Sequence, residues 1–215
     1  MTHLAYHYNE WTHFQNGSWL LLSAYLMGSV PWGWLIGKVF LGFDPRTKGS
    51  GNIGMTNLMR TGGKWAGIAT FILDFGKGWV VLWALSSVFR APEVVTLFGG
   101  FLVIFGHTRS VFLKFTGGKG VATNFGVWAA LDPYVFFAIA CVWIGLFLWK
   151  KISSLSALMS LVFLPAWVFL FNGYDDTLYL ATFVSAYLIV LHKPNIVRLL
   201  DGQEKKLSSK AEPKT

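Results

Sequence analysis

Seven long apolar stretches, separated by short polar segments, dominate the sequence of 215 residues. Their apolar positions are continuous rather than alternating, which predicts helices and disfavours a barrel of strands. The runs lie at about 18–41, 65–89, 94–113, 119–131, 133–149, 153–171 and 177–191. The fourth and seventh are short for a bilayer and are expected to be buried among the others or tilted. The pattern predicts an all-α polytopic membrane protein with about seven transmembrane helices.

This pattern also divides the chain into three parts. We expect an N-terminal extracytoplasmic segment at 1–17, a membrane domain at 18–207 and a cytoplasmic tail at 208–215. Composition supports a membrane protein, because charged residues make up only 13% of the chain and hydrophobic residues 54%. A soluble domain has roughly 25% charged residues. Intrinsic disorder needs low hydrophobicity and high charge, so it is excluded as well.

Few residues of the sequence are suited to bind a metal. The single Cys141 excludes an intramolecular disulfide and a cysteine-based metal site. His3 and His7 have the spacing of one helical turn, but we do not expect a metal site at the end of the chain. We therefore expect no metal and no cofactor.

The net charge of +8 is distributed unevenly between the predicted loops. Seven crossings would place the two termini on opposite sides of the membrane. With that arrangement, 14 of the 18 Lys and Arg residues fall at 42–64, 114–119, 150–151 and from 193 onward, and only Arg90 lies on the other side. The positive-inside rule then predicts an N-terminus outside and a C-terminus in the cytoplasm. Cations between apolar runs indicate anionic lipid or an anionic substrate rather than nucleic acid.

The first predicted cytoplasmic loop, DPRTKGSGNIGMTNLMRTGGK, is rich in glycine and in hydrogen-bond donors. Its donors include Ser50, Asn52, Asn57 and Arg60. Glycine allows backbone N–H groups to turn toward an anion, and Ser and Asn add neutral donors. The alternative interpretation is a flexible basic loop without a binding role.

The second loop, KFTGGKGVATN, places Lys119 among three glycines directly before a predicted helix. The backbone of Gly117, Gly118 and Gly120 could contribute N–H groups, and the helix N-terminus a positive dipole end, to a phosphate. The loop is not a Walker A motif, because Gly120 follows the lysine where that motif has Ser or Thr. A simple helix-entry turn is the alternative.

Further polar residues lie at the end of the last run and within the second. His192 and Asn195 begin the segment HKPNIVRLLDGQEKKL, which by itself reads as an interfacial tail helix. Asp74 and Lys77 are three residues apart and could pair on one helix face. Charges within a span are often functional, although a structural ion pair is the simpler interpretation.

Together these segments resemble the bacterial acyl-phosphate:glycerol-3-phosphate acyltransferase family (PlsY). The resemblance extends from about residue 28 to 206, with the motifs in the order and spacing of the family. Met55, where the family usually has Ala, and Thr-Arg-Ser at 108–110 depart from its pattern. The matching stretches are GSVPWGWLIGK (28–38), DPRTKGSGNIGMTNLMRTGGK (44–64), FGH (105–107), VFLKFTGGKGVAT (111–123) and H-x-x-N-I-x-R-L-x-x-G-x-E-x-K (192–206).

This resemblance implies a seven-span inner-membrane enzyme whose motifs face the cytoplasm. Such enzymes transfer an acyl group from acyl phosphate to the 1-hydroxyl of glycerol 3-phosphate, giving lysophosphatidic acid and phosphate. We expect these two substrates and membrane lipid as partners, with no nucleic acid and no obligate protein partner. The matching catalytic positions are Ser50, Arg60, Lys119, His192 and Asn195. The expected phosphate-binding positions are Gly117, Gly118, Lys119, Gly120, Asn52 and Asn57.

The expected mechanism relies on positioning and charge. Arg60, Lys119 and His192 would neutralise the phosphates, and Ser50 and Asn195 would orient them. Acyl phosphate is already activated, so a phosphate oxygen of the substrate could accept the hydroxyl proton. Alternatives are an acyl-enzyme on Ser50, an organophosphate transporter and a lipid phosphatase. Because glycine and charge cluster at one face, the sequence favours an enzyme over a transporter.

Overall fold

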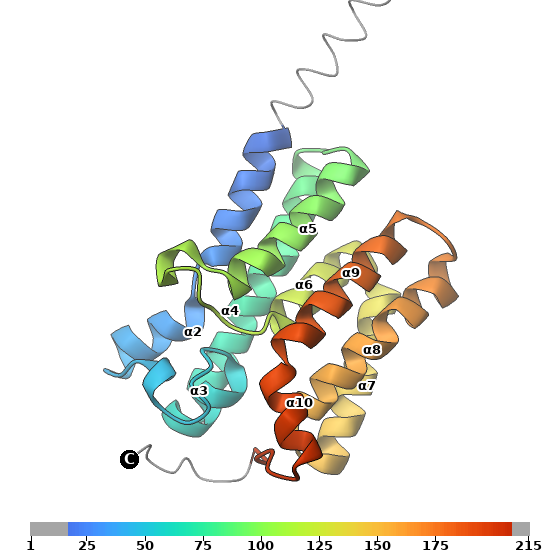
Figure 1. Ribbon diagram of the computed structural model, residues 1–215. Helices are drawn as coiled ribbons and strands as arrows, with labels where there is room; N and C mark the ends of the chain where they lie inside the picture. The colour runs from blue at the N-terminus through green and yellow to red at the C-terminus, as the bar shows by residue number, and fades with distance from the viewer. Residues whose placement is uncertain (1–16, 208–215) are drawn as a thin grey trace, which may run out of the picture.

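The computed structural model describes residues 17–207, and within that range it contains helices and no β-strand. Most of the helices lie side by side in one bundle (Figure 1). The prediction of an all-α fold is therefore confirmed for the described residues. The segments at 1–16 and 208–215, with His3 and His7, lie outside them.

The helices coincide with the apolar runs of the sequence, with two short helices, α3 and α10, added at the polar segments. The largest difference is at the third run, where α5 ends at Thr108 and Val111–Leu113 forms a separate 3₁₀ turn. The bounds are residues 17–29 for the first helix, then α2 Trp32–Leu35, α3 Met55–Gly62, α4 Lys64–Trp83, α5 Glu93–Thr108, α6 Val121–Leu131, α7 Pro133–Lys150, α8 Ser153–Asn172, α9 Asp176–Leu191 and α10 Lys193–Leu200.

The first apolar run is not one continuous helix, because it breaks at Val30 and Pro31. Proline has no backbone N–H and cannot continue the hydrogen-bond ladder. α2 and the π-helical turn Ile36–Phe40 follow the break and lie to one side of the first helix in Figure 1. The Lys77 Nζ atom donates to the carbonyl oxygen of Val30 at 2.9 Å, which satisfies a backbone group freed by the break.

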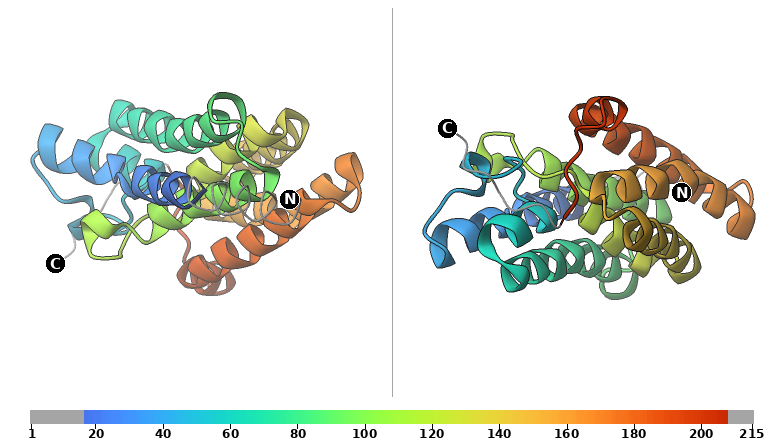
Figure 2. Two further views of the ribbon diagram at one scale, coloured as in Figure 1. Left: turned by 90° about the horizontal axis from the view of Figure 1, so that it is seen from above. Right: turned by 90° about the horizontal axis from the view of Figure 1, so that it is seen from below.

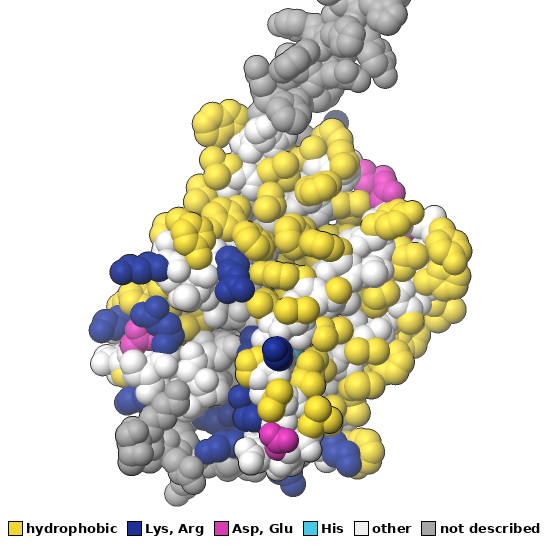
Figure 3. Space-filling view, viewed as in Figure 1, with side chains coloured by type: hydrophobic (Ala, Val, Ile, Leu, Met, Phe, Trp, Pro, Cys, Tyr) yellow, Lys and Arg dark blue, Asp and Glu magenta, His cyan; other side chains and the backbone are white. Residues whose placement is uncertain are grey.

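Four helical segments in the described range are long and apolar enough to cross a membrane: Gly17–Phe40, Lys64–Val88, Pro133–Lys150 and Ser153–Asn172. α9 and α10 together would be a fifth, bent by 62° between them. α5 and α6 are apolar but shorter. The face shown in Figure 3 is covered mostly by hydrophobic side chains, as contact with lipid requires, while Lys and Arg gather toward its lower and left parts.

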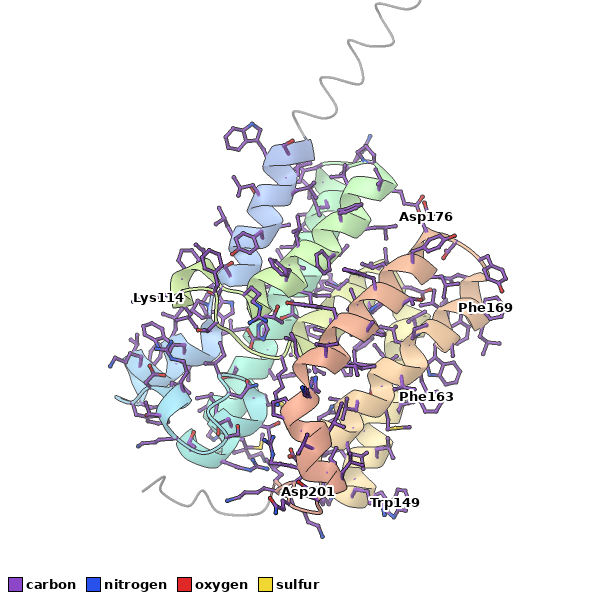
Figure 4. The ribbon with its side chains drawn as sticks, viewed as in Figure 1. Lys114, Trp149, Phe163, Phe169, Asp176 and Asp201 are labelled. Atoms are coloured by element: carbon purple, nitrogen blue, oxygen red, sulfur yellow. The ribbon has the colours of Figure 1, made fainter. Side chains whose placement is uncertain are left out.

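The two described ends of the chain lie at opposite ends of the bundle (Figure 1). Figure 4 places Asp201 and Trp149 at the lower end of the bundle and Asp176 at the upper end. Seen along the bundle, the N-terminal half of the chain lies beside the C-terminal half (Figure 2). α6 belongs to the core, because Val127 and Trp128 are fully buried. The expectation that this short run is enclosed by other helices is confirmed.

Reciprocal glycines let two pairs of helices approach closely. A Cβ atom on Gly78 of α4 would collide with the carbonyl oxygen of Thr123, and one on Gly126 of α6 with that of Phe75. The first helix and α5 use Gly28 and Gly106 in the same way. Small residues are the usual means of close helix packing in membranes, where dispersion contacts replace much of the hydrophobic driving force.

Replacing Gly126 by alanine should destabilise the bundle by about 1–3 kcal/mol, since the new methyl group would force α4 and α6 apart. The measurement is the midpoint of thermal unfolding in detergent. Gly145→Ala in α7 is the matched control, because a Cβ there would have no neighbour within 4 Å. Equal midpoints for the two variants would contradict the close approach of α4 and α6.

Candidate active site

A cavity of about 380 Å³ lies among α3, α4, α6, α7, α8 and residues 192–207, which we call the C-terminal segment. The five predicted catalytic residues all line it, although they come from three distant parts of the sequence: Ser50, Arg60, Lys119, His192 and Asn195. The rest of its wall is largely apolar and includes Phe71, Phe125, Phe136, Trp143 and Ile144. The same space thus has both polar and apolar walls.

The predicted phosphate-binding residues divide into two groups. Asn52, Asn57 and Gly120 line the cavity together with Lys119. Gly117 and Gly118 are not among its lining residues and pack instead against His107, as a Cβ on either would collide with that residue. Gly120 has a φ of 78°, a left-handed conformation that allows α6 to begin at the next residue.

The side chain of Asn57 holds the first glycine-rich loop in place. Its Nδ2 atom donates to the carbonyl oxygens of Pro45, Lys48 and Asn52 at 2.8–3.1 Å, and its Oδ1 atom accepts from the backbone N–H of Ser50 at 2.8 Å. The donors of this amide are therefore directed at the loop backbone. Asn57 positions Ser50, which is a role that the sequence pattern did not reveal.

Ser50 has little activation as a nucleophile in this arrangement. Its Oγ atom accepts a long hydrogen bond from the backbone N–H of Asn52, with 3.5 Å between nitrogen and oxygen. Among residues 17–207, no carboxylate or imidazole is hydrogen-bonded to that hydroxyl group. A serine nucleophile needs an adjacent base, so the geometry favours a binding role for Ser50.

Lys119 is held by a chain of polar contacts that ends in the C-terminal segment. Its Nζ atom contacts the Oδ1 atom of Asn195, whose Nδ2 atom donates to the Oε1 atom of Glu204 at 2.7 Å. Ser154 also donates to that oxygen, at 2.7 Å, and the Nε atom of Arg198 donates to Oε2 at 2.6 Å. The amide of Asn195 thus has a fixed orientation, with its oxygen toward the lysine.

Glu204 has a structural role, and its partners are Asn195, Ser154 and Arg198; the contact with Asn195 was not expected from the sequence. Burial alone would raise the pKa of its carboxyl group, but hydrogen bonds from Ser154 and Asn195 and the pair with Arg198 outweigh that effect and lower the pKa. The carboxylate is therefore charged and orients Asn195. The only sign of this role in the sequence is that Glu204 belongs to the same tail motif as Asn195 and Arg198.

Arg60 is bound to backbone oxygens rather than to a carboxylate. Its Nη2 atom donates to the carbonyl oxygens of Lys205 and Lys206 at 2.8 and 3.1 Å. Its Nε atom is buried and has no hydrogen-bond partner within the described part of the chain. Burial lowers the pKa of the guanidinium from its usual value, but arginine stays charged in proteins. The cation therefore remains available to an anion.

The ring of His192 has one fixed nitrogen. Nδ1 lies 2.8 Å from the carbonyl oxygen of Leu188, and a carbonyl oxygen can only accept, so Nδ1 carries hydrogen. Nε2 is the position left for a substrate. In the neutral ring it accepts a hydrogen bond, and in the protonated ring it donates one.

A buried cluster of charged and polar groups lies beside the cavity. The Lys77 Nζ atom is 3.0 Å from the Oδ1 atom of Asp74, so the predicted pairing of these residues on one helix face is confirmed. The Nδ1 atom of His107 is 3.4 Å from the same carboxylate oxygen. Asp74 and His107 both line the cavity.

Comparison with known proteins identifies the family. A model of the glycerol-3-phosphate acyltransferase family matches residues 18–202. The chain belongs to this family. A glycerol-3-phosphate acyltransferase of Thiobacillus denitrificans is 37% identical over 195 residues, which cover 89% of this chain and 98% of the relative. One from Aquifex aeolicus is 41% identical over 187 residues, covering 86% and 96%. The family predicted from the motifs is confirmed.

Solved structures agree with this glycerol-3-phosphate acyltransferase assignment. The glycerol 3-phosphate form of PlsY, described as an integral membrane glycerol 3-phosphate acyltransferase, is 38% identical, with a TM-score of 0.84. It covers 89% of this chain and 95% of its own. The lysophosphatidic acid form has a TM-score of 0.81 at 36% identity, with the same coverage of both chains. The chain is thus a membrane acyltransferase of phospholipid synthesis, as the sequence predicted.

The activity of this acyltransferase should fall at alkaline pH with an apparent pKa of about 8. Burial lowers the pKa of Lys119 to about 8, with Arg198 adding to the shift and Glu204 opposing it. The lysine loses its charge as the pH rises through that value, so phosphate binding weakens. The measurement is the pH profile of kcat/KM, which reports the free enzyme.

Lys119→Arg should move this alkaline limb upward, because arginine stays charged throughout the accessible range. Lys193→Arg is the matched control, since Lys193 is exposed at the start of α10 next to the site. An alkaline limb that stays at the same pH in Lys119→Arg would show that another group controls it.

Proposed function

We propose that this acyltransferase uses acyl phosphate as its donor and transfers the acyl group to the 1-hydroxyl of sn-glycerol 3-phosphate. The observation that carries this proposal is that one cavity has both a cationic and an apolar wall. Arg60 and Lys119 contact uncharged oxygen atoms there, and aromatic side chains form another part of the wall. A cation without a carboxylate partner suits a phosphate. The apolar wall suits a fatty acyl chain.

The two cations have different geometries and so suit different tasks. Arg60 offers a planar fork of N–H groups that can hold two phosphate oxygens, whereas Lys119 is a compact charge at the entry to α6. Asn52 and Gly120 line the same cavity as Lys119, and with the start of α6 they add neutral donors. Together they would hold the phosphates of donor and acceptor close to each other despite their mutual repulsion.

His192 is better placed to orient a hydroxyl group than to neutralise charge. Its Nδ1 hydrogen is donated to Leu188, so the neutral ring has Nε2 as an acceptor for a glycerol hydroxyl. This modifies the expected role of His192 as a third cation. Ser50 and Asn195 would complete the orientation of the acceptor by hydrogen bonds.

The transfer step needs no covalent enzyme intermediate. The 1-hydroxyl oxygen of glycerol 3-phosphate attacks the carbonyl carbon of acyl phosphate, and the bond from that carbon to the phosphate oxygen breaks. The hydroxyl proton passes to an oxygen of the departing phosphate, so the products are lysophosphatidic acid and inorganic phosphate. Positioning and charge neutralisation supply the rate, because the mixed anhydride already has a good leaving group.

The acyl chain would lie along the aromatic wall formed by α4, α6 and α7. Phe71, Phe125, Phe136, Trp143 and Ile144 line this part of the cavity. α7 is one of the long apolar helices, and most of its surface is not buried by other parts of the described chain. A chain bound beside α7 would therefore be adjacent to lipid.

We also propose the predicted topology of seven spans, with the N-terminus outside and the site at the cytoplasmic face of the bacterial inner membrane. Support comes from the positions of the basic residues and from the two described ends of the chain, which lie at opposite ends of the bundle (Figure 1). α5 and α6 would cross as short helices packed among longer ones. Labelling of single introduced cysteines from each side of intact vesicles is the direct check.

The decisive experiment supplies the purified protein with palmitoyl phosphate, with and without glycerol 3-phosphate, and follows phosphate and lysophosphatidic acid together. We expect phosphate release that depends on the acceptor and equals the lipid formed. Equal release without the acceptor would show a phosphatase instead. A folded protein without turnover that moves glycerol 3-phosphate across vesicles would show a transporter.

The same preparation separates direct transfer from an acyl-enzyme. Ser50→Ala should lose much of the rate in either scheme, so the rate alone does not distinguish them. The protein is therefore incubated with palmitoyl phosphate alone and digested for mass spectrometry. Direct transfer predicts no acylated Ser50 peptide, and a stoichiometric acyl adduct on that peptide would refute it.

A further inference from the structure

The cluster of Asp74, Lys77 and His107 has no part in the transfer step, yet it is nearly enclosed by protein. The exposed fractions of the three residues are 2%, 4% and 5%. They connect α4, α5 and the break in the first apolar run, because Lys77 also donates to the carbonyl oxygen of Val30. Burying charged groups costs free energy even when they are paired, and buried charges within membrane helices often have a function. We therefore expect this cluster to have a function.

The glycine turn before Lys119 rests directly on this cluster. The backbone N–H of Gly118 donates to the carbonyl oxygen of His107 at 3.1 Å. A Cβ on Gly118 would collide with the Nε2 atom of the His107 ring, and one on Gly117 would collide with the His107 carbonyl oxygen. Neither glycine has a positive φ, so collision rather than conformation excludes a larger residue.

We propose that His107, whose Nδ1 atom lies beside the carboxylate of Asp74, is a positioning residue that sets the height of the Gly117–Gly118 turn and thereby the place of Lys119 in the cavity. Lys119 follows the turn directly, so a shift of the turn moves the lysine away from Asn195. The requirement for two glycines here arises from contact with His107.

The pairing within the cluster also suits a cavity for anions. The carboxylate of Asp74 lines the cavity and by itself would repel a phosphate. Lys77 lies 3.0 Å from it and compensates its charge. Asp74 can therefore lie beside the His107 ring without opposing the substrate.

The test uses the predicted collision as a double-mutant cycle. Gly118→Ala should lower kcat/KM by about tenfold or more, because small displacements of a catalytic group are costly. His107→Ala removes the ring with which the new methyl group collides. Gly118→Ala should therefore cost much less in the His107→Ala background than in the wild type, a clear departure from additivity.

Two further glycines provide matched controls. Gly117→Ala collides with a backbone oxygen, so His107→Ala should not relieve its effect. Gly76→Ala in α4 should keep the activity of the wild type, since a Cβ there has no neighbour within 4 Å. The unfolding midpoint of each variant shows whether a loss of activity reflects a loss of fold. Gly118→Ala removes no side chain of the cluster, so its activity and its Lys119 pKa test the proposal even if His107→Ala fails to fold.

A readout independent of turnover is the pH dependence of Lys119 acetylation, measured by mass spectrometry. The groups facing Lys119 are Arg198 and Glu204 of the C-terminal segment and His192 at the end of α9. Displacement into solvent should raise the lysine pKa from about 8 in Gly118→Ala, and His107→Ala should lower it again in the double variant.

These outcomes separate the proposal from the reaction assigned above. The expected effect on activity rests on the proposed role of Lys119 in binding phosphate. If the wild type is inactive but Lys119 acetylation follows the expected pattern, the proposed reaction is contradicted and the positioning role of His107 is not. Folded Gly118→Ala with unchanged kcat/KM and unchanged Lys119 pKa would overturn the positioning role of His107. Additive losses in the cycle would overturn it as well.

Discussion

The site depends on holding two half-buried cations, Arg60 and Lys119, without neutralising their charge. Lys119 contacts an amide oxygen, and Arg60 contacts two backbone carbonyl oxygens. Partial charges of this kind solvate a cation but leave its net charge for a phosphate. The carboxylate of Glu204 lies one step further away, where Arg198 pairs with it. A carboxylate in direct contact with Lys119 would stabilise the empty site and weaken the binding of an anion.

The same constraint accounts for the contacts that the residues after α10 make with α3 and α8. Glu204 accepts from Ser154 of α8, Arg60 of α3 reaches the backbone of Lys205, and the N–H of Leu207 donates to the carbonyl oxygen of Lys151 at 3.0 Å. The segment after α10 thereby becomes a wall of the cavity instead of a free tail. The bend of 62° between α9 and α10 turns the chain toward the site. His192 lies at this bend, with Asn195 one turn later.

Glycine has two different uses in this fold. Pairs such as Gly78 and Gly126 remove side chains so that helix backbones touch, which lets short helices be enclosed in the bundle. Gly120 instead adopts a left-handed conformation that starts α6. Gly117 and Gly118 also leave space, in their case for the carbonyl oxygen and the ring of His107, although their motif resembles a phosphate loop. The composition of a glycine-rich turn therefore does not tell which of its residues faces a ligand.

The sequence by itself determined most of the helices and the five polar residues expected in the site. Long apolar runs in a bilayer have few alternatives to helix, and the family motifs carry those five residues. The structure decided the rest. It decided the break at Pro31, the use of Asn57 to hold the loop, the orientation of Asn195 by Glu204 and the contact of the glycine turn with His107. It also joined Arg60 to Lys205 and Lys206, which are 145 and 146 positions further along the chain. A polar side chain can choose among many partners, and only the packing of the helices decides which of them lies within hydrogen-bond distance.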